Sequence, residues 1–394
     1  ALITLAFTST SSIAGPKIEV LHWWTSGGEA AALKVLKDDF AANVALKARI
    51  VAGDPPSASQ IKGPTIQEYD QEGVVAPYNI DSVAQAEGWD NLLDPMIAAI
   101  HKCDNNSGPY CAAPVNIHRI DWMWANKAVF DANGISVPTT WDELNAAADK
   151  LQAAGIIPFA HGGQAWQDAT VFEAVAMGLG GNNYYKNCYV DLKENCLRSE
   201  TTVKVFDQMR KLQGYTDEGS PGRDWNVATG MVIEGKAGFQ IMGDWAKGEF
   251  TAAGKKPGVD YYCAATPSNN GYLYNVDSFI FYKSSDPDKQ AGQKLLAKLM
   301  MGKNFQKVFN LYKGSIPARL DVSMDEFDKC AKTSNADIKT AGAKGGLVPS
   351  FAHGMAQGNT MKAALQDIIT EHFNSDMSSV DAANALADSV LANM

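Results

Sequence analysis

The sequence predicts an α/β protein with two large domains, and three observations support this. Residues 17–23 (KIEVLHW) alternate in polarity like a strand, Gly27-Gly28 interrupts the pattern, and residues 29–40 have helical spacing. A strand, a glycine turn and a helix form a βα unit, the building block of α/β folds. The chain has 394 residues, 46% of them apolar, which is enough for two cores. No repeat, low-complexity tract or flexible linker divides it, so we expect the chain to cross between the domains more than once.

The remainder of the chain continues to alternate between helices and strands. Thr140 can cap a helix because Glu143 follows three residues later, and this helix runs to Leu151 and ends at Gly155. The other expected elements are strands at 156–161 and 237–242, an aromatic β-favouring run at 272–282, helices at 206–212, 286–301 and 304–312, and two amphipathic helices within 361–394.

The charge balance excludes some classes of partner. The chain has 34 Lys+Arg and 44 Asp+Glu, a formal net charge of −10. A protein that binds the phosphate backbone needs a basic face, so we expect no nucleic-acid partner. No apolar run is long enough to span a bilayer as a helix.

The six cysteines indicate an oxidising compartment. Cys103 and Cys111 enclose seven residues, and so do Cys188 and Cys196. The first enclosed stretch (DNNSGPY) is rich in turn formers, so its ends can meet. Pairing Cys103–Cys111 and Cys188–Cys196 leaves Cys263–Cys330, although six cysteines allow fifteen connectivities. The alternative is a set of free thiols in the core.

The first residues resemble the end of a secretory signal. Residues 1–7 (ALITLAF) are apolar, and Ser12 and Ala14 place small residues three and one before Gly15. We expect residues 1–14 to be a remnant of a signal peptide, cleaved after Ala14. The alternative is an ordinary chain end.

No catalytic, metal or cofactor motif is present. The sequence lacks GxSxG, HExxH, Walker A and GxGxxG patterns, and its six histidines contain no i, i+4 pair. We therefore expect no catalytic residue, metal or cofactor. A glycosidase needs only two carboxylates beside the scissile bond, and 44 acidic residues make such a pair unspecific.

Tryptophans at loop ends are the unusual feature. Trp23 and Trp24 end the first strand, and Trp245 follows another strand. Ligands of α/β sheets bind at the carboxyl ends of strands. The apolar face of a pyranose packs on an aromatic ring, while its hydroxyls both donate and accept hydrogen bonds. A single tryptophan more often fills a core, but adjacent strand residues face opposite ways, so the doublet cannot point into one core.

Several motifs match a known family. They are LHWWTSGGEAAALKVLKDDF, GDPPSASQIKGPTIQEYDQEG, VPTTWDEL, GDWAKGEF, NVDSF, LYKGSIPAR and FAHG. Together they resemble the extracellular solute-binding proteins of ABC importers, within which HWWTSGGE and QIKGP point to the sugar-binding group. The resemblance covers nearly the whole chain from Lys17.

The resemblance implies a two-lobed periplasmic-binding-protein fold with the ligand in the cleft between the lobes. Lobe 1 would take residues 15–123 and 278–318, and lobe 2 residues 124–277 and 319–394. Crossing strands would lie near Trp122–Asn126 and Tyr274–Ser278. One departure is that Ala41-Ala42-Asn43 leads directly into Val44, where the family has a further strand.

The resemblance also implies sugar contacts at the matching motifs. Trp24 would stack on the pyranose with Trp23 alongside, and Trp245 would close the opposite face. The residues implied as hydrogen-bond partners are Glu29, Gln60, Lys62, His118, Asp277, Lys313 and His353.

The function expected from this resemblance is the capture of a monosaccharide without chemical conversion, with glucose as the first candidate. The lobes would close on the sugar and deliver it to a membrane permease. We expect a monomer in the periplasm. The alternative is a secreted glycoside hydrolase with a tryptophan-lined cleft, and a third reading is another solute, such as a disaccharide, in the same fold.

Overall fold

Three sheets organise the chain in a computed structural model that describes residues 19–37, 56–267 and 271–394. The first has the order β1(Val20–Leu21), β2(Ala58–Ile61), β10(Ser278–Phe281), β3(Ala112–Pro114), and the second β6(Ile157–Phe159), β7(Ala237–Ile241), β5(Trp122–Asn126), β8(Tyr261–Ala265). The third lies between them, with the order β11(Leu347–Pro349), β9(Tyr272–Asn275), β4(His118–Arg119).

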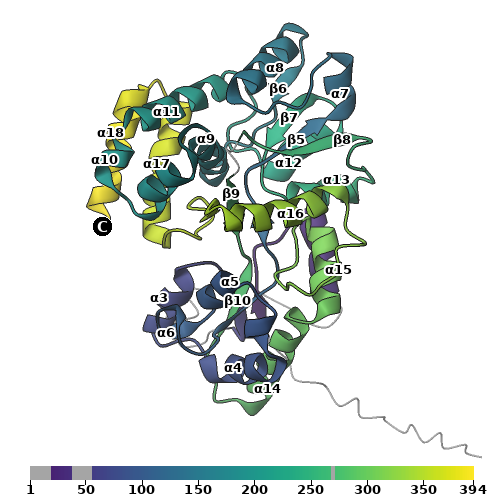
Figure 1. Cartoon of the computed structure of the whole chain (residues 1–394), viewed down its shortest axis with the longest axis vertical. Coiled ribbons are helices and arrows are strands. Elements are labelled where there is room, and N and C mark those ends of the chain that lie inside the picture. Colours follow the sequence, from purple (N-terminus) through teal and green to yellow (C-terminus); the bar gives the residue numbers. More distant parts are fainter. Residues whose placement is uncertain (1–18, 38–55, 268–270) are drawn as a thin grey trace, which may run out of the picture.

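Each of the two four-stranded sheets belongs to one lobe (Figure 1). In lobe 1, β1 runs parallel to β2, while β10 is antiparallel to both β2 and β3. Its helices are α1(Gly27–Lys37), α3(Thr65–Gln71), α4(Pro77–Glu87), η1(Trp89–Asn91), α5(Pro95–Ile100), α6(Cys103–Asn106), α14(Pro287–Met300) and α15(Lys303–Lys313). Their main apolar cluster includes Trp24, Phe279 and Phe309.

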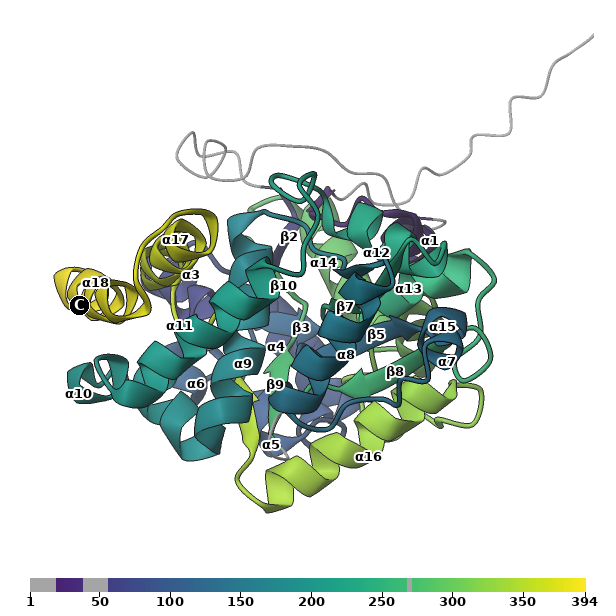
Figure 2. The same ribbon diagram turned by 90° about the horizontal axis from the view of Figure 1, so that it is seen from above.

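Lobe 2 is the larger and more helical lobe. Here β6 is parallel to β7, and β5 is antiparallel to both β7 and β8. Its helices are α7(Lys127–Ala132), α8(Trp141–Ala153), α9(Ala165–Tyr185), η2(Lys186–Val190), α10(Glu194–Leu197), α11(Glu200–Gln213), α12(Trp225–Ile233), α13(Ala246–Ala252), α17(Asn359–Asn374) and α18(Ser379–Ala392). Helix α16(Lys329–Ala343) lies at the level between the lobes in Figure 1 and at one edge of the molecule in Figure 2.

The chain crosses between the lobes through the central sheet. After β4 it enters β5 of lobe 2, and after β9 it enters β10 of lobe 1. The predicted aromatic run 272–282 is therefore two strands, separated at Val276 and Asp277. The backbone N–H of Asp277 donates to Asn116 Oδ1 (2.9 Å) instead of continuing the ladder. The lobe boundaries expected from the sequence stay a prediction.

Local sequence signals explain several helix ends. Thr140 and Glu143 form the predicted capping box at the start of α8. The expected helix 206–212 is longer because Ser199 caps it at Thr202. At the other end of a helix, α15 stops after Lys313 because Gly314 takes a left-handed backbone (φ 96°). That turn places Lys313 beside the space between the lobes.

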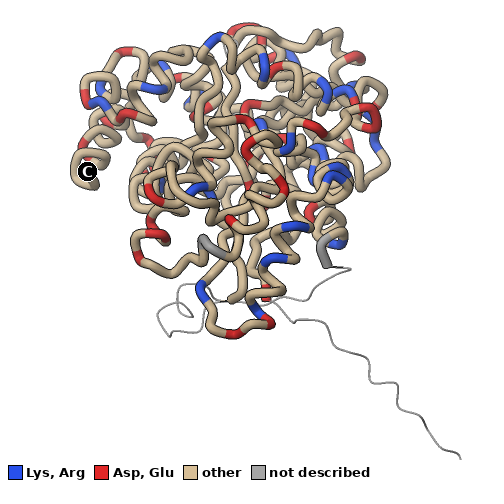
Figure 3. Tube along the Cα trace, turned by 60° about the horizontal axis from the view of Figure 1, so that its bottom comes forward, with Lys and Arg blue, Asp and Glu red and all other residues tan. Residues whose placement is uncertain are grey.

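The disulfides and the distribution of charge can be compared with what the sequence predicted. Disulfides join Cys103–Cys111, Cys188–Cys196 and Cys263–Cys330, the pairing that the spacing favoured. Acidic and basic residues are interspersed along the described trace (Figure 3). Within the described ranges, no helix is both long and apolar enough to cross a membrane. The expected signal remnant 1–14 and the departure at 41–44 lie outside the described residues.

Candidate functional site

A cavity of about 560 Å³ lies between the lobes, and every site residue expected from the sequence lines it. Residues of lobe 1 and of the crossing strands form one wall, and residues of lobe 2 form the other. The ten residues are Trp23, Trp24, Glu29, Gln60, Lys62, His118, Trp245, Asp277, Lys313 and His353.

Asp277 is the centre of the first wall. It is 1% exposed, and its Oδ1 accepts from Lys62 Nζ (3.2 Å) and Gln60 Nε2 (3.2 Å). Its Oδ2 accepts from Asn116 Nδ2 (3.0 Å) and lies 3.0 Å from His118 Nε2. Burial would raise the pKa of this carboxyl, but Lys62 and His118 hold the pKa well below its ordinary value. Asp277 is therefore a fixed anion among donors.

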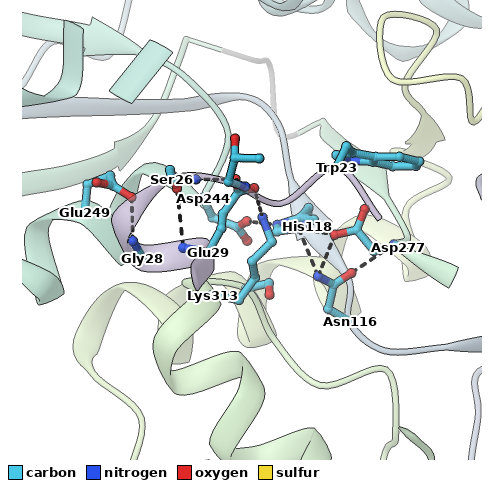
Figure 4. A network of polar contacts seen from close by, with 12 residues as sticks. Trp23, Ser26, Gly28, Glu29, Asn116, His118, Asp244, Glu249, Asp277 and Lys313 are labelled. Carbon is cyan, nitrogen blue, oxygen red and sulfur yellow. Dashed lines mark hydrogen bonds and ion pairs between the residues drawn. The ribbon is translucent and has the colours of Figure 1, made fainter. Parts of the chain in front are cut away.

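His118 connects Asp277 to lobe 2. Its other ring nitrogen, Nδ1, contacts Asp244 Oδ1, and Asp244 Oδ2 accepts from the backbone N–H of Arg119 (3.0 Å). Burial lowers the pKa of the imidazole, but the two carboxylates outweigh it and raise the pKa. The charged form of His118 is thus favoured between two anions (Figure 4).

Glu29 and Lys313 form a second pair of buried charges. Lys313 Nζ lies 2.7 Å from Glu29 Oε1, while Glu29 Oε2 accepts from the backbone N–H groups of Thr25 (3.1 Å) and Ser26 (3.3 Å). Burial would raise the pKa of Glu29, but Lys313 and these backbone bonds lower it. The carboxylate is held at the first turn of α1, where helix N–H groups favour an anion.

The tryptophan doublet separates into an exposed and a buried ring. Trp23 is 49% exposed, and Lys62 Nζ lies 5.1 Å from its ring centroid. Trp24 is 2% exposed and packs against Phe279 and Phe309, at centroid distances of 5.7 and 5.0 Å. The sequence assigned the stack to Trp24, whereas Trp23 offers the more exposed ring face here.

The lobe 2 wall is aromatic. The ring centroids of Trp245 and His353 are 4.9 Å apart, and Trp166 lies 5.8 Å from His353 and 6.3 Å from Trp245. His353 Nε2 contacts Thr170 Oγ1 at 2.9 Å. Burial first, then the cations Lys62 and His118, lower the pKa of His353 well below its ordinary value, so this imidazole is neutral.

Other lining residues were not assigned from the sequence. Trp166 and Trp225 line the cavity, but no motif of the sequence linked them to the site. Asn275 lies two residues before Asp277 in NVDSF, and both polar atoms of its buried carboxamide lack a hydrogen-bond partner among the described residues. The remaining lining residues are Thr25, Ile61, Thr65, Tyr69, Gln164, Ala352, Gly354, Asn359, Lys362 and Gln366.

The cavity suits a neutral polyhydroxylated ligand. Its charges are mostly arranged in mutual pairs, which offer donors and acceptors to hydroxyls. Among the residues that the structure describes, no group of three or more His, Cys, Asp or Glu could hold a metal ion.

Comparison with known sequences identifies the family. Residues 26–300 match the family of bacterial extracellular solute-binding proteins. A "Probable sugar-binding periplasmic protein" of Brucella suis biovar 1 is 45% identical over 392 residues, covering 95% of this chain and 91% of the relative.

Solved structures agree on the fold. The bacterial solute receptor AcbH, described as having an exclusive substrate preference for β-D-galactopyranose, superposes with a TM-score of 0.80 at 18% identity, covering 95% of this chain and 98% of that one. A chitin oligosaccharide binding protein gives the same TM-score at 16% identity, covering 96% and 99%. At these identities the likeness concerns the fold alone, which is the two-lobed α/β fold expected from the sequence.

Proposed function

The chain belongs to the bacterial extracellular solute-binding protein family, and from that membership we propose that it is the periplasmic sugar-binding component of an ABC importer, with a monosaccharide, glucose first, as its ligand. The sugar binds in the cavity between the lobes. The lobes close on it, and the closed protein delivers it to the membrane permease. It acts as a monomer, one chain per sugar.

The observation that carries this proposal is the pairing of fixed charges opposite aromatic rings within one cavity. Asp277 and Glu29 each keep their charge beside a lysine, so they accept hydroxyl hydrogens without taking up a proton. Trp23 and Trp245 provide aromatic surface for the C–H face of the ring. An analogue without one hydroxyl leaves a buried charged group unpaired, which gives selectivity among sugars.

Asn275 adds a contact to the proposal. A carboxamide donates and accepts side by side, which matches two neighbouring hydroxyls. Its buried and unpartnered polar atoms carry a free-energy cost that a bound ligand relieves.

Closure follows from contacts that the sugar gains with both walls. A ligand shifts an open–closed equilibrium only through its differential affinity for the closed form. Because one wall belongs to each lobe, a sugar that touches Asp277 and Trp245 at once favours closure.

The alternative of a secreted glycoside hydrolase is not supported. A glycosidase requires a carboxyl group with a raised pKa as its general acid. The pKa of Asp277 and of Glu29 is lowered, not raised. Burial raises the pKa of Glu173 to about 8, but this residue does not line the cavity.

The test is a panel of sugars. We expect glucose to bind with one-to-one stoichiometry in calorimetry and to raise the melting temperature, with weaker effects for galactose, mannose and maltose. Labelled oligosaccharides incubated with the protein should remain intact. No heat and no melting shift with any sugar would overturn the proposal, and a hydrolysis product would replace it with the enzyme.

A further inference from the structure

Beside the cavity, a helix of lobe 2 packs directly on two helices of lobe 1. Helix α13 contacts α1 and α15 (Figure 2). Ala246 and Phe250 of α13 belong to the lobe 2 core, whereas Leu33 of α1 and Phe309 of α15 belong to the lobe 1 core. The contact therefore joins the cores of the two lobes.

The two backbones approach so closely that neither lobe has room for a side chain. A Cβ added to Gly28 would lie 2.6 Å from the carbonyl carbon of Gly248 and 2.9 Å from its Cα and its oxygen. A Cβ on Gly248 would lie 2.8 Å from the carbonyl oxygen of Tyr312. Neither glycine has a positive φ, so close approach rather than backbone conformation explains them.

A hydrogen bond accompanies this approach. Glu249 Oε1 of α13 accepts from the backbone N–H of Gly28 at 2.7 Å (Figure 4). Gly28 is in the first turn of α1, whose N–H groups have no partner within the helix. A carboxylate of lobe 2 thus caps a helix of lobe 1, which the helix dipole also favours.

The capped N–H belongs to the residue before Glu29. The carboxylate of Glu29 lines the cavity, pairs with Lys313 and accepts from Thr25 and Ser26. The cap from lobe 2 and the cavity-facing carboxylate are therefore on consecutive residues of one helical turn.

We propose that Gly28, Gly248 and Glu249 form an interlobe latch, in which Glu249 is a positioning residue that fixes the first turn of α1 when the lobes are closed. Glu29 keeps its bonds to Lys313, Thr25 and Ser26 within lobe 1, and the latch steadies the turn that carries it. Opening breaks the bond from Glu249 and leaves the backbone N–H of Gly28 to water, while Ser26 Oγ still accepts from the backbone N–H of Glu29. Closing restores the bond, so the first turn of α1 becomes fixed as the lobes close. This inference rests on the proposed function, because Glu29 is there a ligand residue.

The glycine contact provides the first test. Gly28→Ala places a methyl group whose three nearest contacts are backbone atoms of Gly248 in lobe 2, so we expect it to block closure. Gly230→Ala is the matched control, because Gly230 is also helical, has no positive φ and has open space at its Cβ. We expect Gly28→Ala to bind glucose at least tenfold more weakly and to show no decrease in radius of gyration with saturating glucose, while the control behaves as wild type.

Glu249 provides the second test. Glu249→Ala removes the acceptor, whereas Glu249→Gln keeps a carbonyl oxygen at the same place. We expect the affinity for glucose to fall several-fold in Glu249→Ala and to stay within twofold of wild type in Glu249→Gln. The melting temperature without sugar should match wild type in both, which a general loss of stability would not produce.

Amide hydrogen exchange reports the cap directly, because closed molecules with the bond from Glu249 belong to the open–closed equilibrium without sugar and predominate with it. In the first turn of α1 exchange should be faster in Glu249→Ala and Gly28→Ala than in wild type, and unchanged in Gly230→Ala. Wild-type exchange and wild-type affinity in Gly28→Ala and Glu249→Ala would overturn the latch. If wild-type protein binds no sugar, the proposed function fails and the exchange measurement alone decides the latch.

Discussion

The two walls of the cavity differ in how they meet a ligand. The wall of lobe 1 and the crossing strands carries buried ion pairs, Glu29–Lys313 and Asp277–Lys62. The wall of lobe 2 carries Trp166, Trp245 and a neutral His353. Fixed charges stabilise a hydroxyl only where it lies within hydrogen-bonding distance, whereas an aromatic face makes contact with any pyranose. The charged wall should therefore select the sugar and the aromatic wall should retain it.

The two tryptophans of the doublet have different roles in the charged wall. Trp24 packs in the lobe 1 core beneath this wall, whereas Trp23 offers an exposed ring to the ligand. Trp24→Ala should lower the free energy of unfolding by about 3–5 kcal/mol, because it removes a buried ring from between Phe279 and Phe309. Trp23→Ala should leave unfolding unchanged, because Trp23 is half exposed, and should weaken glucose binding by about 1 kcal/mol. Urea unfolding and calorimetry measure the two effects. An equal loss of unfolding free energy in both variants would contradict these different roles.

Removal of a central charge should have the largest effect on binding. In Asp277→Asn, Lys62 remains buried without its anion and His118 keeps only Asp244, so glucose affinity should fall by about 3 kcal/mol, roughly a hundredfold. Calorimetry of Asp388→Asn, an acidic partner of Arg198 outside the cavity, is the control. Affinity within threefold of wild type in Asp277→Asn would exclude Asp277 from the site.

A change in the aromatic wall should have a smaller and less selective effect. Trp245→Ala should weaken the binding of every pyranose by about 1–2 kcal/mol, because the variant loses contact area and ring stacking. Trp245→Phe should recover part of the lost affinity. If calorimetry showed a loss of affinity for one sugar only, Trp245 would instead recognise a particular hydroxyl.

The pH dependence of stability should be the smallest effect. Because its carboxylate neighbours raise the pKa of His118, the contribution of this residue is complete below about pH 6.5 and is lost as the pH rises through the raised folded-state value. Asp277 has a lowered pKa, so its contribution is present above about pH 4 and is lost as the pH falls below that.

The measurement compares urea unfolding of wild type and His118→Asn. The advantage of wild type should shrink as the pH rises from about 6 to about 9. A constant difference across that range would contradict a raised pKa.

The sequence predicted local features and motif positions better than pairings across the fold. The capping box of Thr140 and Glu143 and the spacing of Cys103 and Cys111 depend on nearby residues, so both were predictable. Strand alternation predicts that Trp23 and Trp24 face opposite ways, but not which ring lies in the core, because that depends on Phe279 and Phe309 far along the chain.

Contacts between distant segments were not predictable from local pattern. Asp244 and Glu249 read as ordinary acidic residues of GDWAKGEF, yet they meet His118 and Gly28, which lie 126 and 221 residues away. Only the packing of the lobes brings them together. Asn275 had a usable signal, because a two-residue spacing places it on the same side of an extended chain as Asp277.

The division between a selecting and a retaining wall is tested most directly by calorimetric affinities for glucose and its epimers galactose and mannose, measured in wild type, Asp277→Asn and Trp245→Ala. We predict that the ratio of glucose to epimer affinity collapses toward one in Asp277→Asn and stays at the wild-type value in Trp245→Ala, although both bind glucose more weakly. A ratio preserved in Asp277→Asn, or lost in Trp245→Ala, would contradict the account.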